Sequence, residues 1–184
     1  SAIEDTKYGW SIVNLSDISE NLDSKRVPIT KSKRISGPVP YYGASGGVDY
    51  VDGWLFDEEL LLISEDGANL LMRTYPIAYS ISGKAWVNNH AHILKFKNRS
   101  LQKWVELYIN ATDISTFISG MAQPKLNQTK LNLIPIPIPS DKALDAVLDK
   151  VLTVFARIEE LKQINNEKQK AVSALKASVL VNEL

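Results

Sequence analysis

The side chains best suited to chemistry in this 184-residue chain are polar and aromatic, and they lie in three loop-like segments. Residues 41–47 place two rings beside a glycine-rich backbone, residues 82–90 carry a cation, two amides and an imidazole, and residues 120–130 carry amides and lysines. Amides pair well with adenine edges, and lysines pair with guanine or phosphate. We therefore expect contacts to nucleic acid from Tyr41, Tyr42, Ser45, Arg73, Lys84, Asn88, Asn89, His90, Gln123, Lys125, Asn127 and Lys130.

Catalytic and metal-binding motifs are absent from the sequence, which has no G-x-G-x-x-G, no P-loop lysine motif and no H-E-x-x-H. His90 and His92 have the spacing of metal ligands on a strand. Without cysteine or a third histidine, structural or DNA-contacting roles fit them better. The acids of residues 57–66 read as an acid pair, a divalent site or exposed loop acids, and Ser45 has no identifiable base. We expect a non-enzymatic chain that holds no metal or cofactor.

Charge is segregated along the chain, although its 21 basic and 21 acidic residues cancel. Residues 24–37 hold five cations and no acid, residues 38–72 hold seven acids and no base, and residues 73–104 are basic again. Such blocks can fold into a basic face, or they can be a solvated surface with chance clustering. If they form a face, Lys31, Lys33 and Arg34 are the expected phosphate contacts.

The pattern of residues predicts an α+β domain over residues 1–140. Residues 11–15 and 60–64 are apolar runs typical of strands, residues 75–81 and 85–87 read as strands around a glycine turn, and residues 90–96 alternate. Ser100 is the expected N-cap of a helix over residues 101–109, and residues 113–119 predict a short helix that Gly120 ends.

A proline track at residues 133–139 marks the boundary, because alternating prolines force an extended, stiff segment whose isoleucines can still dock on the domain. One long helix is predicted after it, over residues 141–184. Its heptad stripe comprises Val147, Val151, Val154, Ile158, Leu161, Asn165, Lys168, Val172, Leu175 and Val179.

The stripe predicts a coiled coil, since a helix of about 42 residues spans roughly 60 Å and exceeds the width of such a domain. Folding back onto its own domain is the alternative. β-branched a positions suit a parallel dimer, while the mid-helix polar pair Asn165 and Lys168 fixes register or orientation. No apolar run reaches the length of a membrane span, the N-terminus is unlike a signal peptide, and the lack of cysteine fits a cytoplasmic protein.

Four ordered segments, PYYGASG (residues 40–46), LLISEDG (61–67), GKAWVNNHAH (83–92) and GMAQPKLN (120–127), precede the proline track and the long helix. Together with residues 10–15, this series resembles the specificity (S) subunit of type I restriction-modification systems over nearly the whole chain. The Glu-Gln that usually follows the proline track in this family is replaced here by Ser140-Asp141-Lys142-Ala143.

The resemblance implies a target-recognition domain at residues 1–140 that reads one half of a split double-stranded DNA sequence, and a spacer helix at residues 141–184. It also implies that methyltransferase (M) and restriction (R) subunits dock on this scaffold. S-adenosylmethionine, ATP and Mg are then expected only on those partner subunits, and the S subunit itself is not catalytic.

One recognition domain and one helix correspond to half of a standard S subunit, whose two helices run antiparallel. We therefore expect a half-length subunit or a fragment that forms a homodimer through its helix and reads an inverted repeat. The alternative function is a non-catalytic coiled-coil interaction protein that binds or blocks a DNA-binding partner.

Overall fold

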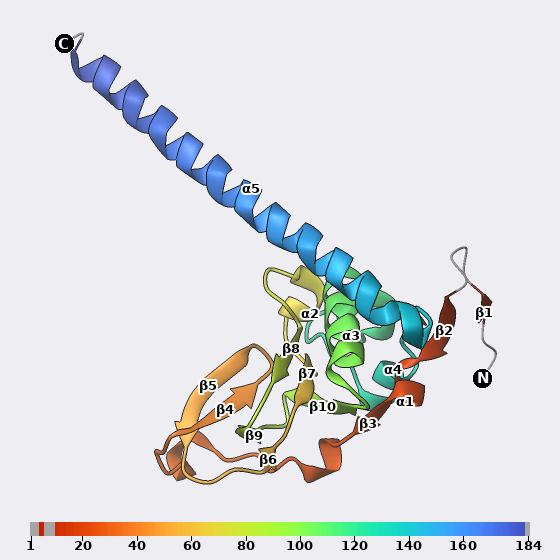
Figure 1. Ribbon diagram of the computed structural model, residues 1–184. Helices are drawn as coiled ribbons and strands as arrows, with labels where there is room; N and C mark the ends of the chain where they lie inside the picture. The colour runs from red at the N-terminus through yellow and green to blue at the C-terminus, as the bar shows by residue number, and fades with distance from the viewer. Residues whose placement is uncertain (1–3, 6–9, 183–184) are drawn as a thin grey trace. The chain divides into compact units, whose positions relative to one another are not determined.

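The structure is a computed structural model that describes the backbone of residues 4–5 and 10–182, and the side chains of residues 10–140 and 142–178. The chain divides into two compact units, Ser1–Ser140 and Asp141–Leu184 (Figure 1). The expected α+β domain followed by one long helix is confirmed. No helix within the described part of the chain is long and apolar enough to cross a membrane.

The first four-stranded sheet of the N-terminal unit has the order β3-β10-β7-β8, and all of its strands are antiparallel. Its strands are β3 (Ser19–Asn21), β7 (Leu60–Ser64), β8 (Ala78–Ile81) and β10 (Ala91–Phe96). All five residues of β7 are buried, as its continuous apolar run predicts. Helix α3 (Arg99–Ala111) packs on this sheet beside β8 (Figure 1).

The second four-stranded sheet has the order β5-β4-β9-β6, and its β4–β9 pair is parallel. Its strands are β4 (Val39–Gly43), β5 (Gly46–Val51), β6 (Phe56–Asp57) and β9 (Lys84–Val87). Strands β8 and β9 lie on either side of Gly83 as expected, but they belong to different sheets and form no hairpin. One buried cluster joins the two sheets, with Leu60, Leu62 and Ile93 from the first and Ala85 and Val87 from the second.

The proline track is extended, as predicted, and pairs with the opening strand of the domain. Strand β11 (Pro135–Ile138) lies antiparallel to β2 (Ser11–Asn14), which also pairs with β1 (Glu4–Asp5). Ile136 is fully buried, and the indole of Trp104 donates a hydrogen bond of 2.8 Å to the Pro137 carbonyl. The track is therefore a docked strand with fixed register.

The remaining elements of the N-terminal unit are short helices: α1 (Leu15–Ile18), α2 (Asn69–Met72), α4 (Gln128–Asn132), and the 3-10 turns η1 (Asp23–Lys25), η2 (Lys31–Lys33) and η3 (Ser115–Phe117). Two expectations need correction. The side chain of Asn98, not Ser100, caps α3 by accepting the Leu101 N–H at 2.8 Å. Residues 113–119 form only the turn η3, which Asp113 holds by accepting the Ser115 N–H.

Helix α5 (Asp141–Asn182) is continuous over 42 residues, so its heptad positions share one stripe. Val154, Ile158, Leu161, Val172 and Leu175 are exposed apolar side chains on that stripe. Asn165 and Lys168 are also exposed, Val147 and Val151 are half-buried, and the side chain of Val179 lies outside the described residues.

Candidate nucleic-acid interface

Loops that are far apart in the sequence meet where strands β4, β7 and β9 end and β10 begins. The Ser64 hydroxyl donates to the Ala44 carbonyl at 2.6 Å, the Asn88 N–H donates to Tyr42 O at 3.0 Å, and the Glu65 N–H donates to His90 O at 2.9 Å. These bonds hold residues 43–47, 64–68 and 88–90 together.

A tight loop over residues 119–125 joins the same end of the domain. Ser119 and Lys125 exchange two backbone hydrogen bonds of 2.9 and 2.8 Å, which close the loop at its base. Pro124 O then accepts the Gly67 N–H at 3.1 Å, and the Leu126 N–H donates to Glu65 O at 2.8 Å. We call residues 43–47, 64–68, 88–90 and 119–127 the loop end.

The exposed surface of the loop end carries donors and acceptors of both charges. His90 Nδ1 lies 2.8 Å from the Asp66 carboxylate, and Lys125 Nζ lies 3.1 Å from the Glu65 carboxylate. Gln123 is exposed beside them. Residues 66–68 and 122–125 line a pocket of about 420 Å³. Carboxylates accept hydrogen bonds from cytosine amino groups and amides pair with adenine, so this surface has the chemistry to read base edges.

A buried polar network lies beneath that surface. His92 joins Asp23 through Nδ1 at 2.6 Å and the Leu126 carbonyl through Nε2 at 2.7 Å. The Arg26 guanidinium reaches the Glu65 carboxylate at 2.5 Å and lies 3.6 Å from that of Asp23. Burial raises the pKa of both carboxyls, but hydrogen bonds and nearby positive charge outweigh burial and hold each pKa below its usual value.

The structure also shows whether His90 and His92 could bind one metal ion together. Asp23, Glu65 and His92 place three potential ligand atoms within 4.8 Å of one another. Arg26 already supplies positive charge there, and both ring nitrogens of His92 are engaged with other groups. His90 bonds to a different carboxylate, so the His90-x-His92 spacing does not form a shared pair of ligands.

A second group of predicted residues lies away from the loop end, around β5 and the start of β9. Lys31 and Lys33 are exposed in η2, whereas Arg34 pairs with Asp49 at 2.9 Å and lies over the Tyr41 ring. Lys84 is exposed, with its ammonium 3.6 Å above the half-exposed ring of Trp54. A cation beside an exposed aromatic face suits contact with a nucleic-acid backbone.

The structure corrects the expected roles of Tyr41 and Asn88, whose side chains are buried. Tyr41 is fully buried, and its hydroxyl exchanges hydrogen bonds with the backbone of Ile29. Asn88 is 8% exposed and accepts the His90 N–H at 2.8 Å. Tyr42, the neighbour of Tyr41 on the other face of β4, is only half-buried. Asn88 therefore supports the backbone of the loop end, and Tyr41 supports the segment that holds Ile29, without either side chain reaching the surface.

Two further residues that were expected to contact nucleic acid, Arg73 and Asn127, instead form hydrogen bonds with the ends of helices. Arg73, at φ 52°, donates to Ile109 O and Thr112 O and so satisfies the C-terminal carbonyls of α3. Asn127 caps α4 by accepting the Lys130 N–H at 2.9 Å. Lys130 and Asn89 are exposed, and Ser45 shares a hydrogen bond of 3.2 Å with the Tyr75 hydroxyl.

Sequence reasoning did not identify the roles of the acids at the loop end, or of Asp23 and Arg26 in the buried network beneath it. Asp66 and Glu65 lie within the LLISEDG segment, where they read as loop acids. Arg26 lies in the basic block of residues 24–37 but was not among the expected contacts, and Asp23 lies outside every segment that was singled out. A polar pair directly after a five-residue apolar strand is the available local signal, because strand ends commonly carry functional groups. No local pattern marks Asp23, whose partner His92 is far away along the chain.

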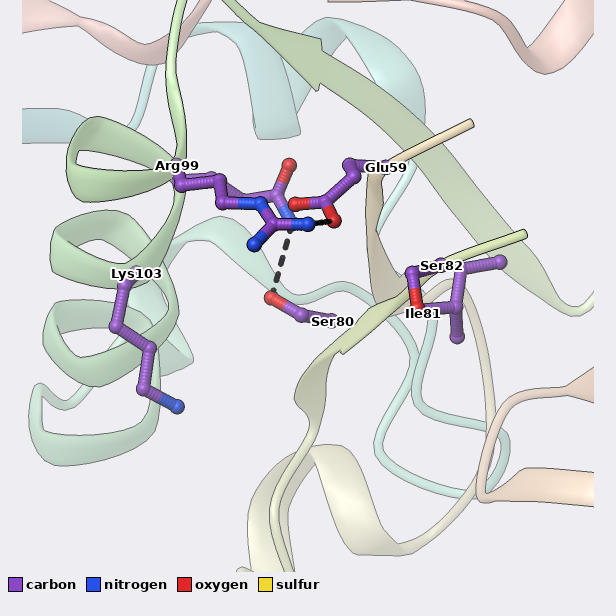
Figure 2. Close-up of a pocket in the computed structure, with 7 residues that line it drawn as sticks. Glu59, Ser80, Ile81, Ser82, Arg99 and Lys103 are labelled. Atoms are coloured by element: carbon purple, nitrogen blue, oxygen red, sulfur yellow. Dashed lines mark hydrogen bonds and ion pairs between the residues drawn. The ribbon is translucent and has the colours of Figure 1, made fainter. Parts of the chain in front are cut away.

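Another pocket, of about 410 Å³, lies between β8 and α3 (Figure 2). Its cations are matched by acids: Arg99 pairs with Glu59, and Lys103 pairs with Glu106 at 2.5 Å. The Ser80 hydroxyl also donates to Glu106. Because these charges cancel locally, this pocket is a weaker candidate for binding a polyanion than the loop end.

The fold and the loop end together define the class of the protein: an α+β domain that gathers exposed polar groups at one end, followed by a long helix with an apolar stripe. The chain belongs to the type I restriction modification DNA specificity domain family, whose model matches residues 7–169. This finding confirms the family that the four sequence segments resemble. Members of that family supply specificity and not catalysis.

A curated relative, a type I restriction enzyme specificity subunit of Haemophilus influenzae, is 35% identical over 137 residues. The match covers 74% of this chain and 34% of that protein, so the chain spans about a third of its relative's length.

Solved structures share the fold at low identity. The S subunit of a type I restriction-modification system from M. genitalium matches at TM-score 0.63 and 12% identity, over 89% of this chain and 42% of that one. A structure described as showing complex assembly and conformational transition of the type I system matches at 0.68 and 15%, over 94% and 45%. The HsdS subunit from Thermoanaerobacter tengcongensis matches at 0.55 and 15%, over 85% and 41%.

Proposed function

We propose that this chain reads one half of a bipartite double-stranded DNA target through its loop end, and directs methyltransferase and restriction subunits to that target. The observation that carries the proposal is the convergence of residues 43–47, 64–68, 88–90 and 119–127 on one end of the domain. Loops of a rigid scaffold are the usual place for recognition groups, and family membership supplies the class of ligand.

Within this proposal the polar groups divide by role. Gln123, Lys125 and Asp66 line the loop-end pocket, His90 pairs with Asp66, and these side chains contact base edges. Lys31, Lys33 and Lys84 are exposed elsewhere on the domain and contact phosphates, which fix register without reading sequence.

Partner subunits supply the chemistry in this proposal. S-adenosylmethionine, ATP and Mg bind the methyltransferase and restriction subunits, and the assembly acts on DNA in the cytoplasm. Family membership supports this division of labour, as does the likeness of the fold to a structure described as an assembled type I system.

Helix α5 joins two copies of the chain in this proposal. An exposed apolar stripe of this length favours a partner helix, because burying each of these side chains is worth about 1.5–3 kcal/mol. Identical domains read identical half-sites, so a two-fold dimer recognises an inverted repeat with a fixed gap. Inserting whole heptads into α5 should widen that gap.

The test combines the full chain with a methyltransferase subunit of a type I system and a pool of random-sequence duplexes, and reads the methylated sites by sequencing. Gln123→Ala and Lys125→Ala should each lower methylation of the preferred sequence by roughly tenfold or more, or relax its specificity at one position. Gln163→Ala and Lys170→Ala are matched controls, because both residues are exposed on α5 and lie off its apolar stripe.

Unchanged sequence preference in both loop-end variants would remove the loop end as the reading surface. Failure of the unsubstituted chain to direct any sequence-dependent methylation, with the complex still assembled, would instead favour an interaction protein that blocks a DNA-binding partner.

A further inference from the structure

The imidazole of His92 is almost completely buried, at 1% exposure, and both of its nitrogens meet oxygen atoms. Nδ1 lies 2.6 Å from the Asp23 carboxylate, and Nε2 lies 2.7 Å from the backbone carbonyl of Leu126. A carbonyl oxygen accepts hydrogen bonds and cannot donate them, so Nε2 must carry a proton.

Whether Nδ1 of His92 must carry a proton depends on whether the Asp23 carboxyl is ionised. Its second carboxylate oxygen accepts the Ile93 N–H at 2.8 Å, and Arg26 lies 3.6 Å from the first. These partners favour the ionised carboxylate, because a backbone N–H and a nearby positive charge both stabilise the charged form. An ionised carboxylate only accepts, so a neutral imidazole would leave one of the two oxygens facing a bare nitrogen lone pair.

Leu126 connects the 119–125 loop to the rest of the loop end and to His92. Its N–H donates to Glu65 O, its side chain is fully buried, and its carbonyl accepts from His92. The 119–125 loop precedes it directly, and Asn127, the next residue, caps α4. His92 therefore ties β10 to the segment that presents Gln123 and Lys125.

We propose that His92 is a positioning residue that acts as a doubly protonated imidazolium, and that its proton fixes residues 119–127 in the arrangement used for recognition. The role in recognition rests on the function proposed above, whereas the protonation and the fixed loop stand on the geometry alone.

Four charged groups face His92 or its partner from the surrounding elements. Asp23 comes from η1, Glu65 follows β7 with its carboxylate 3.9 Å from Nδ1, and Arg26 and Lys125 both pair with Glu65. Two carboxylates thus face two cationic side chains and the imidazolium. The imidazolium donates from both ring nitrogens, so loss of either proton removes one of the two hydrogen bonds that hold the loop.

The first test is nitrogen NMR of the imidazole rings in the full chain, with no DNA present. Both ring nitrogens of His92 should carry protons, because each faces an oxygen acceptor. His90 is the internal control, because only its Nδ1 has a carboxylate partner and its ring is about half exposed. A His92 ring with one protonated nitrogen under these conditions would overturn the proposal.

Amide hydrogen exchange then tests the hold on the loop. After correction for intrinsic pH dependence, exchange at the Gly67, Lys125 and Leu126 N–H groups should rise about tenfold or more as His92 loses its proton, since a hydrogen bond to a charged donor is lost. Protection that stays constant through the titration would contradict the positioning role.

Asp23→Asn provides a rescue that a purely structural role would not produce. An amide at position 23 can donate to Nδ1 of a neutral His92, which leaves Nε2–H on the Leu126 carbonyl. This variant should keep the three amides protected at every pH at which it is folded. If D23N retains the pH dependence of the unsubstituted chain, the imidazolium is not what holds the loop.

Discussion

The carboxylate of Glu65 lies 3.1 Å from the ammonium of Lys125, and this pair joins the end of β7 to the 119–125 loop. The same carboxylate also binds Arg26 at 2.5 Å. One acid therefore orients a lysine that we assign to DNA and secures the buried network below it. The exposed surface of the loop end and the polar core of the domain are consequently one connected structure.

Acid should weaken this structure, because the pKa values of Asp23 and Glu65 are lowered by folding. A lowered pKa in the folded state gives stability that is complete above the unfolded values, about 3.9 and 4.3, and is lost as the pH falls through the folded values. We expect Glu65→Gln to cost about 1–2 kcal/mol of unfolding free energy at pH 7 and to flatten the acid side of the stability profile.

Urea unfolding followed by tryptophan fluorescence at several pH values measures both effects. Glu58→Gln is the control, because Glu58 pairs with Lys95 on the exposed surface, where an ion pair contributes little. An acid limb of equal slope in the E65Q variant and the unsubstituted chain would contradict the prediction.

The turn at Gly120 should tolerate no side chain. Its φ is 78°, and a Cβ there would lie 2.6 Å from the Gln123 carbonyl oxygen. Gly83 has a nearly equal φ of 73° with nothing within 4 Å of a Cβ, so Gly83→Ala measures the conformational strain alone. We expect Gly120→Ala to cost about 1–3 kcal/mol more than Gly83→Ala in urea unfolding, and equal costs would show that the loop yields freely.

Much of the framework could be predicted from local patterns. The apolar run of β7, the alternating prolines of β11 and the heptads of α5 each encode their own structure, because hydrophobic period and proline geometry act over a few residues. The two-residue period of a strand also explains why Tyr41 is fully buried and Tyr42 only half-buried, because neighbours on a strand face opposite sides.

Long-range partners could not be predicted in this way. Asp23 and His92 are 69 positions apart in the sequence, and no periodicity connects them. The sequence suggested that Arg73 is available to contact nucleic acid. Its backbone is left-handed, however, and its guanidinium donates a hydrogen bond to the Ile109 carbonyl at the end of α3. Residue type alone gave the chemistry of the loop end, whereas burial decided which of its residues reach the surface.

Salt dependence should separate phosphate contacts from base contacts. Lys31→Ala and Lys33→Ala should weaken DNA binding equally for all sequences, and each should reduce the slope of log affinity against log salt by about 0.9. Lys170→Ala is the matched control, because it is an exposed lysine on α5. Fluorescence anisotropy with a fixed duplex across a salt series measures the slopes, and unchanged slopes in both variants would move the phosphate contacts elsewhere.

The polar positions of α5 determine how two copies should pair. In a parallel dimer, Lys168 would face the same lysine of the other copy. An antiparallel dimer in which Asn165 faces Lys168 avoids this repulsion, because the asparagine oxygen can accept a hydrogen bond from the ammonium. That register also sets Leu161 against Val172 and Ile158 against Leu175, so apolar residues meet apolar ones.

Cysteine crosslinking can test this register directly, because the chain contains no cysteine. Chains carrying Ile158→Cys, mixed with chains carrying Leu175→Cys, should form a covalent pair of about twice the 20.5 kDa chain mass with a short thiol crosslinker. Neither variant alone should crosslink, since each position faces the other across the two-fold axis. Efficient crosslinking of Ile158→Cys by itself would establish parallel helices, and a monomer by light scattering at every concentration would exclude the dimer.

The antiparallel result would set the starts of the two helices roughly 75 Å apart at 1.5 Å per residue, which is the spacing that α5 would then impose on the two half-sites.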